Sequence, residues 1–142
     1  MNVIKQYQKQ ISFLSEYQNI ERGLEALKER KAEIYEKLTA CTASTDRERL
    51  NGTKSNTREK TLAMYADMEN IIEEKELQLA ALQKKILIAV AEIPDSILSS
   101  ILYEKYVNGL TWYQISMKIN YSDKHIIQHL FPKALSLLRL PA

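Results

Sequence analysis

The sequence contains few of the residues that interrupt helices or that support specialised chemistry. Its 142 residues include three glycines, three prolines and one cysteine. Scarce glycine and proline favour helix over nearly the whole chain. The single cysteine, Cys41, excludes an intramolecular disulfide and is typical of a reducing, cytoplasmic location. No stretch approaches the roughly 20 apolar residues of a membrane-spanning helix, so we expect no membrane partner.

Histidine, which often performs catalysis or binds metals, is equally scarce. His125 and His129 are the only two histidines, and Asp123 is the one nearby carboxylate that could join them as a metal ligand. The sequence has no glycine-rich phosphate loop, and Cys41 lies far from both histidines. We therefore expect a protein that is not an enzyme and has neither a cofactor nor a metal site.

Two long segments carry apolar residues at helical spacing. From Asn2 to about Ala40, and from about Thr57 to Glu92, apolar side chains recur every three or four residues. Neither segment contains proline, and Gly23 is the only glycine in them. This heptad-like spacing predicts long coiled-coil helices. An irregular step around Tyr17–Ile20 indicates a stutter or a local change of partner.

The segment between these helices, residues 41–56, is rich in threonine, serine and asparagine. It predicts a polar loop, about which the two helices fold back as an antiparallel hairpin. The apolar spacing has gaps at Lys31 and Lys75. Because two helices bury little surface by themselves, we expect a homo-oligomer through the coiled coil, or docking on another protein.

A second domain is predicted from Pro94 onward. Pro94 ends the second long helix, and Asp95 can cap the next one. That helix should end near Gly109, which suits a C-terminal cap with a positive φ. The predicted domains are therefore a helical hairpin over residues 1–93 and a small domain over residues 94–142.

Within the small domain, Thr111 and Ser122 each begin an apolar-periodic segment. Thr111 and Gln114 fit a capping box, and Ser122 can cap the second segment. Asn120 suits the left-handed conformation of a tight turn between them. Trp112 is either a plug over the core of this domain or a ligand-stacking group. Two capped helices joined by a three-residue turn predict a helix-turn-helix within an all-α fold.

The polar residues of this motif predict a DNA-binding surface. In a helix-turn-helix the exposed start of the second helix meets base edges, so Lys124, His125 and Gln128 are candidate base-reading residues. Basic residues nearby are candidates for phosphate contacts, namely Lys118, Lys133 and Arg139. Ser122 and His129 complete the predicted interface, and double-stranded DNA is the expected partner.

The stretch 102–135 resembles the fourth region of bacterial RNA polymerase sigma factors and the sigma-like domain of small phage regulators. The matching residues are Leu102, Lys105-Tyr106, Val107, Gly109-Leu110, Thr111-Trp112, Ile115, Ile119, Tyr121-Ser122, Ile126 and Ala134-Leu135. In layout, with a charged helical half before the motif, the chain is similar to phage proteins related to the RinA and ArpU late-gene activators. The resemblance implies a phage or prophage transcriptional regulator, with RNA polymerase as a possible protein partner.

Two features depart from the pattern of that family. Ser116 stands where alanine is usual, and Leu130-Phe131-Pro132 stands where basic or polar residues are common. Pro132 removes a backbone hydrogen bond, so the second helix should kink or end near Phe131. Residues 94–142 carry five Lys/Arg against three Asp/Glu, which is weakly basic for a DNA-binding domain. We therefore expect that two copies bind DNA together, or that another protein supplies part of the affinity for DNA.

The sequence thus predicts a sequence-specific DNA-binding transcriptional regulator. The alternative is a coiled-coil interaction module, an antirepressor or an adapter, whose helix-turn-helix no longer reads DNA. The weak basicity and Leu130-Phe131-Pro132 favour that alternative.

Overall fold

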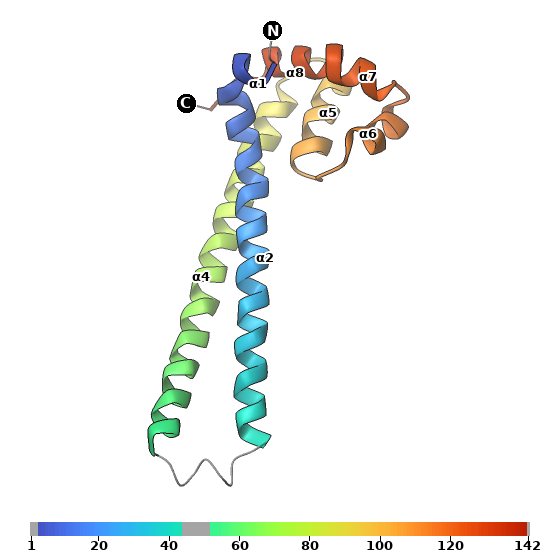
Figure 1. Ribbon diagram of the computed structural model, residues 1–142. Helices are drawn as coiled ribbons and strands as arrows, with labels where there is room; N and C mark the ends of the chain where they lie inside the picture. The colour runs from blue at the N-terminus through green and yellow to red at the C-terminus, as the bar shows by residue number, and fades with distance from the viewer. Residues whose placement is uncertain (1–2, 44–51, 142) are drawn as a thin grey trace. The chain divides into compact units, whose positions relative to one another are not determined.

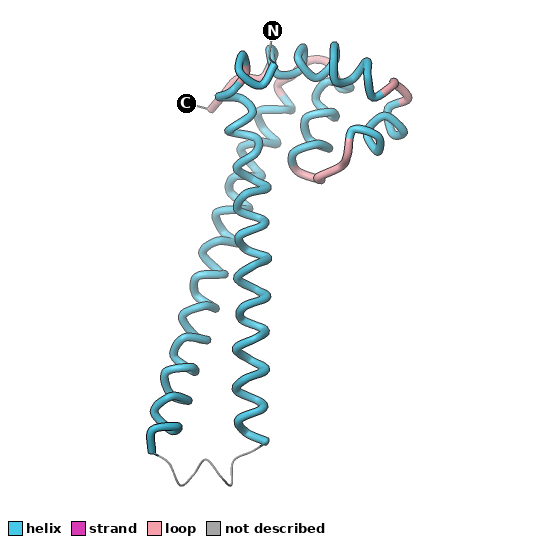
Figure 2. Tube along the Cα trace, in the orientation of Figure 1, coloured by secondary structure: helices cyan, strands magenta, loops and turns pink. Residues whose placement is uncertain are grey.

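The computed structural model describes residues 3–43 and 52–141, and in these residues it is all-α, with helices and connecting turns but no strand (Figure 2). The first helices are α1, Val3–Gln6, and α2, Gln8–Ala43. They run on through Tyr7, whose N–H donates to the carbonyl of Val3 at 3.0 Å. Helix α4, Gly52–Ala91, is the second long helix. Among the described residues no helix is long and apolar enough to cross a membrane.

The long helices extend further than the sequence predicts. Helix α2 continues to Ala43, and α4 begins at Gly52, so both ends of the expected polar loop 41–56 are helical. The remainder of that expected loop, residues 44–51, lies outside the described residues. Threonine and serine can continue a helix when the turn beside them is already formed, because their intrinsic helix propensity is only modestly lower than that of alanine.

By the contacts between its residues, the chain divides into two compact units. Unit 1 comprises residues 1–20 and 79–142, and unit 2 comprises residues 21–78. The short C-terminal helices therefore form one unit with the first part of α2 and the last part of α4. The division at Ile20 and Glu21 falls beside the irregular apolar step in the sequence.

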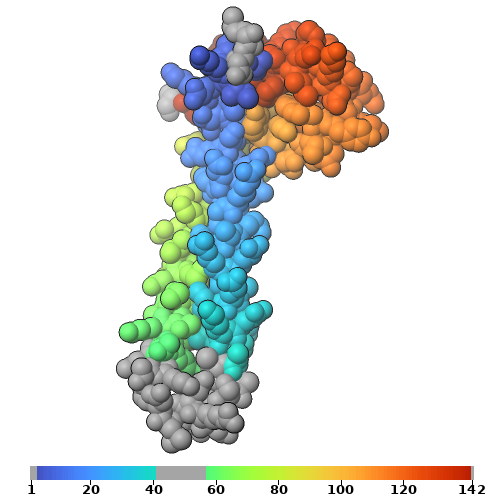
Figure 3. Space-filling model, viewed as in Figure 1, coloured from blue at the N-terminus to red at the C-terminus, as the bar shows by residue number. Residues whose placement is uncertain are grey.

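After α4, the described residues of unit 1 form five short helical elements (Figure 1). They are α5 (Ser96–Tyr106), α6 (Trp112–Ile119), α7 (Asp123–His125), the π-helical turn η1 (Ile126–Leu130) and α8 (Phe131–Leu137). In the space-filling view the red end of this group of helices lies against the blue first turns of α2 (Figure 3). The largest fully buried side chains are Leu14, Ile86, Val90, Leu98, Ile101, Leu102, Ile115, Ile126 and Leu135. Each side chain buried in this way contributes on the order of 1.5–3 kcal/mol.

The turn between α4 and α5 has the caps that the sequence predicts. Asp95 accepts hydrogen bonds from the backbone N–H groups of Ile97 and Leu98, at 2.9 and 3.3 Å. The Ser99 hydroxyl donates to the carbonyl of Val90 at 2.7 Å and so ties α5 to the last turn of α4. These contacts fix where α5 begins relative to the long helix that precedes it.

Unit 2 is a pair of helical segments with a thin core. Its buried apolar side chains in the described residues are Leu24, Leu38, Met68 and Ile72. Where the apolar spacing has its gap at Lys31, the Lys31 ammonium lies 5.3 Å from the ring centroid of Tyr65. The Tyr35 and Tyr65 rings lie 6.2 Å apart and span the space between the helices.

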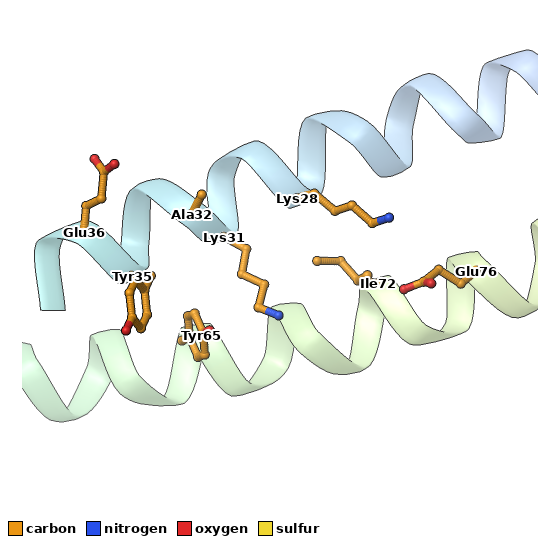
Figure 4. Close-up of a pocket in the computed structure, with 8 residues that line it drawn as sticks. All are labelled: Lys28, Lys31, Ala32, Tyr35, Glu36, Tyr65, Ile72 and Glu76. Atoms are coloured by element: carbon orange, nitrogen blue, oxygen red, sulfur yellow. The ribbon is translucent and has the colours of Figure 1, made fainter. Parts of the chain in front are cut away.

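An open groove follows this aromatic pair along one side of unit 2 (Figure 4). Lys28, Lys31, Ala32, Tyr35 and Glu36 line it from α2, and Tyr65, Ile72 and Glu76 from α4. Beside Tyr35 and Tyr65, aliphatic side chains therefore do not fill the space between α2 and α4.

The turn after α5 depends on a positive backbone angle. Gly109 has φ +69°, and the N–H of Leu110 donates to the carbonyl of Glu104 at 3.0 Å. A Cβ added to Gly109 would meet only Gln18 Nε2, at 3.8 Å. The need for glycine here therefore comes from the backbone conformation and not from lack of space.

We expect Gly109→Val to destabilise unit 1 by about 1–3 kcal/mol, because a β-branched residue is strained at positive φ. Gly109→Asn is the matched control and should cost less, since asparagine adopts this region readily. Thermal and urea unfolding of both variants measure the difference. Equal stability of the valine and asparagine variants would contradict this explanation of the turn.

Candidate nucleic-acid interface

Helix α6 begins and ends through local hydrogen bonds that the sequence predicts. The Thr111 hydroxyl accepts from the Gln114 N–H at 3.2 Å, and the Gln114 side chain accepts from the Thr111 N–H at 2.9 Å. The capping box is therefore confirmed. At the other end Asn120 has φ 63° and ψ 34°, the left-handed conformation expected of it. Together these residues fix the length of α6 and the direction in which the chain leaves it.

Helix α7 begins at the cap that the sequence predicts. The Ser122 hydroxyl accepts from the N–H of His125 at 3.2 Å, and Asp123 lies in the first turn, where a negative charge complements the helix dipole. Ile126 is fully buried, whereas Lys124, His125 and Gln128 are exposed. The buried isoleucine fixes the rotation of α7, so these three polar side chains face away from the core.

The sequence predicts that the second helix kinks or ends near Phe131, and the structure shows that it does not end there. Helical residues continue to Leu137, and the helix widens into the π-helical turn η1 just before the proline. The N–H of Phe131 donates to the carbonyl of Ile126, five residues earlier. In a regular α-helix the proline ring would meet the carbonyl of Gln128. The wider turn relieves that clash, so the chain continues as a helix.

Trp112 packs against the core of unit 1. Its ring lies edge-on to Phe131, with centroids 4.9 Å apart. The Lys105 ammonium lies 4.5 Å from the Trp112 ring centroid, and desolvation lowers the pKa of this lysine. The carbonyl of Lys105 accepts a hydrogen bond from Gln18 Nε2 at 2.9 Å, which joins the end of α5 to α2 within the unit. Of the two interpretations from the sequence, these contacts favour the plug over the core.

All seven residues of the predicted interface are exposed: Lys118, Ser122, Lys124, His125, Gln128, His129 and Lys133. The structure brings three rings into a row along α7 and η1. Tyr121 stacks on His125 with centroids 5.5 Å apart, and His125 lies 5.2 Å from His129. The described residues contain no group of three or more metal-ligating side chains. The His125 and His129 rings are tilted by 42° to one another, and their spacing of four residues places them on one face of the helical stretch.

Lys118 differs from the other predicted residues because it has a partner within the chain. Its ammonium lies 2.7 Å from Glu104 Oε1, and Asn108 donates to the other oxygen of Glu104 at 3.1 Å. The hydrogen bond from Lys118 is the main cause that lowers the pKa of Glu104. The side chain of Glu104 is 12% exposed, whereas that of Lys118 is 58% exposed. Lys118 therefore joins α6 to α5, and its charge is largely balanced.

The surface around α6 and α7 also exposes apolar side chains that the sequence interpretation missed. Tyr113 is 66% exposed, Met117 65%, Tyr121 40% and Ile127 41%. Tyr113 and Met117 lie four residues apart, on the side of α6 opposite the buried Ile115. The helical spacing of Ile115 and Ile119 is the sequence signal that could have found them, because it places Tyr113 and Met117 on the opposite face of α6.

The charge of unit 1 is greater than that of its C-terminal residues alone. Unit 1 carries nine Lys/Arg against five Asp/Glu, whereas unit 2 carries 11 against 13. The basic residues outside the C-terminal stretch are Lys5, Lys9, Lys84 and Lys85, all of them exposed. The weak basicity counted over residues 94–142 therefore understates the charge of the compact unit that carries the candidate interface.

In the comparison with known proteins, no family model, curated protein or solved structure matches the chain.

Glu104→Gln tests the ion pair with Lys118, because it removes the charge but keeps the shape. The pKa of Glu104 is lowered in the folded state, so its charge stabilises the fold above the unfolded pKa of about 4.3. This contribution is lost as the pH falls through the folded pKa. Since Lys118 is largely exposed, we expect a loss of only about 1 kcal/mol at neutral pH.

The measurement is urea unfolding of Glu104→Gln and of the unmodified protein at neutral and at acidic pH. The difference between them should shrink as the pH falls. Glu92→Gln is the control, because Glu92 is an exposed glutamate of the same unit. If Glu104→Gln lowers the free energy of unfolding by the same amount at every pH, the charge of Glu104 is not the cause of the loss.

Proposed function

We propose that this chain is a sequence-specific DNA-binding transcriptional regulator of phage or prophage type. Helices α6 and α7, joined by the turn at Asn120, act as its helix-turn-helix. The observation that supports this most is the start of α7, where Ser122 caps a helix that buries Ile126 and exposes Lys124, His125 and Gln128. A helix held in this way presents its first polar side chains to the edges of base pairs in the major groove.

Two further observations support DNA as the partner. The candidate interface belongs to the basic unit of the chain, and the exposed lysines of that unit can neutralise phosphates. The stretch 102–135 also resembles the fourth region of sigma factors, and that resemblance implies a DNA-binding helix-turn-helix. By the same resemblance, RNA polymerase is the protein partner that we propose for the regulator.

The proposal divides the polar residues by role. Gln128 can form paired hydrogen bonds with the N6 and N7 atoms of adenine, and Lys124 can reach guanine O6 and N7. His125 and His129 lie along the same stretch of α7 and η1. Lys133 and Arg139, which follow on the C-terminal side, are assigned to phosphates. Lys118 is assigned a lesser role, because Glu104 already balances its charge.

We also propose that the active form is a homo-oligomer that assembles through the long helices as a coiled coil. Its support is the thin core of unit 2, where Lys31 and the two tyrosines stand in place of aliphatic contacts. Two copies would double the number of phosphate contacts and would match a site with two-fold symmetry.

The alternative is an interaction module, an antirepressor or an adapter, whose helix-turn-helix no longer reads DNA. The exposed Tyr113, Met117 and Ile127 favour it, because aromatic and methionine side chains are enriched in protein interfaces. The two functions differ in whether the polar start of α7 discriminates between DNA sequences.

Two substitutions on α7 and α8 should affect DNA binding in different ways. Gln128→Ala should relax sequence preference and cost about 1–3 kcal/mol at one base position. Lys133→Ala should weaken all sequences alike and flatten the dependence of affinity on salt. The measurement is binding of a selected duplex and a scrambled duplex by each variant across a salt series.

Lys28→Ala is the matched control, because it removes an exposed lysine from unit 2, which contains none of the proposed DNA-binding residues. It should leave sequence preference unchanged. If the unmodified protein binds both duplexes equally, and only at millimolar concentration in moderate salt, the DNA-reading proposal fails and the interaction module replaces it.

A further inference from the structure

One side of unit 2 carries two rows of apolar side chains that its own core leaves uncovered. Leu27 and Ile34 are half-buried on α2, and Met64 and Ile71 are 51% and 42% exposed on α4. The members of each pair lie seven residues apart, which is the heptad repeat of a helix that packs against another helix. We call these four residues the Met64–Ile71 face.

This face lies on the side of unit 2 opposite the groove. Lys31 lies over Tyr65 between the helices. On one side of Lys31 around α2, Lys28 and Tyr35 line the groove. At 100° per residue, Leu27 and Ile34 fall on the other flank of Lys31. On α4, Ile72 and Glu76 line the groove (Figure 4). The same reasoning from Ile72 at 100° per residue places Met64 and Ile71 away from the groove.

Charged residues border the Met64–Ile71 face with the same spacing. Arg30 and Lys37 lie beside it on α2, and Asp67 and Glu74 lie beside it on α4; all four are exposed. Each pair is again seven residues apart. Because Lys31 and Tyr35 both contact Tyr65, Arg30 lies at the level of the segment between Asp67 and Glu74. Within the described residues, none of the four forms an ion pair with its own chain.

We propose that the Met64–Ile71 face binds the same face of a second copy, so that unit 2 forms a four-helix bundle. A two-fold axis parallel to the helices places α2 of the second copy against α4 of the first, with all neighbouring helices antiparallel. A rotation about this axis does not change the position of a residue along the helices. Arg30 of each copy therefore lies beside Asp67 and Glu74 of the other. The inference deepens the oligomer in the proposed function by naming its surface and its orientation.

The size of the face suits a stable dimer. The helical segments of unit 2 on each copy are on the order of 35 Å long, and two helices side by side are about 20 Å wide. The area covered is then roughly 700 Å² per copy, or about 1,400 Å² in total, within the range of specific dimers. The two apolar rows supply the centre of that interface, and the charged pairs supply its rim.

The groove side suits a second copy less well. Glu36 and Glu76 line the groove, and Glu69 and Glu73 are exposed nearby on the same flank of α4. These four carboxylates outnumber Lys28 and Lys31 of the groove, so two copies joined on this side would bring two net negative surfaces together. Like charges brought together in this way disfavour association.

The first test compares two glutamate substitutions on α4. Ile71→Glu places a charge in the Met64–Ile71 face, whereas Leu77→Glu places one at a position that is 67% exposed and lies off the face. Light scattering at micromolar concentration should give twice the 16.5 kDa chain mass for the unmodified protein and for Leu77→Glu. Ile71→Glu should raise the dissociation constant of the dimer on the order of 100-fold and give the mass of one chain.

Circular dichroism should show that Ile71→Glu keeps its helix content, because Ile71 is already exposed in one chain. A monomeric unmodified protein would overturn the inference. So would a dimer that Leu77→Glu disrupts and Ile71→Glu does not, since that result would place the interface on another side of α4.

The second test uses charge reversal and does not depend on how well any single variant folds. Arg30→Glu should weaken the dimer about tenfold, because the pairing occurs twice in a two-fold assembly. Adding Asp67→Lys and Glu74→Lys to Arg30→Glu should restore the dimer. Failure of this rescue would contradict the proposed orientation. The masses are measured without DNA. Failure of the dimer proposal can therefore be distinguished from failure of the DNA-binding proposal.

Discussion

The structure of unit 1 depends on one shared hydrophobic core. Its short helices contribute only a few buried side chains each, too few for any of them to fold independently. Leu14 from α2 and Ile86 from α4 complete the core around Ile115, Ile126 and Leu135. The long helices therefore do more than link parts of the chain, because their ends supply the surface on which α5 to α8 are held.

This core determines the geometry of the candidate interface. Burial of Ile126 sets the rotation of α7, and the caps at Thr111, Asn120 and Ser122 set where α6 ends and α7 begins. The ion pair between Lys118 and Glu104 then joins α6 to the end of α5. The polar side chains at the start of α7 are thus held on rigid helices, which suits recognition better than a loop would.

The features of this region that the sequence predicted are those with local signals. The capping box at Thr111, the caps at Asp95 and Ser122, and the left-handed turn at Asn120 each depend on residues within about four positions of one another. Exposure of the predicted interface residues followed from the position of Ile126 in the apolar stripe. The all-α character followed from the scarcity of glycine and proline.

The features that the sequence did not predict depend on contacts between distant residues or on competing local effects. Glu104 and Lys118 are 14 positions apart, and no periodicity connects them. The π-helical turn arises because the proline clash is relieved by widening the preceding turn while the core holds Phe131 and Leu135 in place. The division between Ile20 and Glu21 depends on which helical segments share a core.

The central claim is that the start of α7 reads the sequence of double-stranded DNA. Selection of bound duplexes from a random pool by the purified full chain tests it most directly. The account predicts enrichment of one motif, with two half-sites related by two-fold symmetry, and loss of that enrichment when Lys124 and Gln128 are both replaced by alanine. A pool that stays random after repeated rounds, or a motif that survives the double substitution, would contradict it.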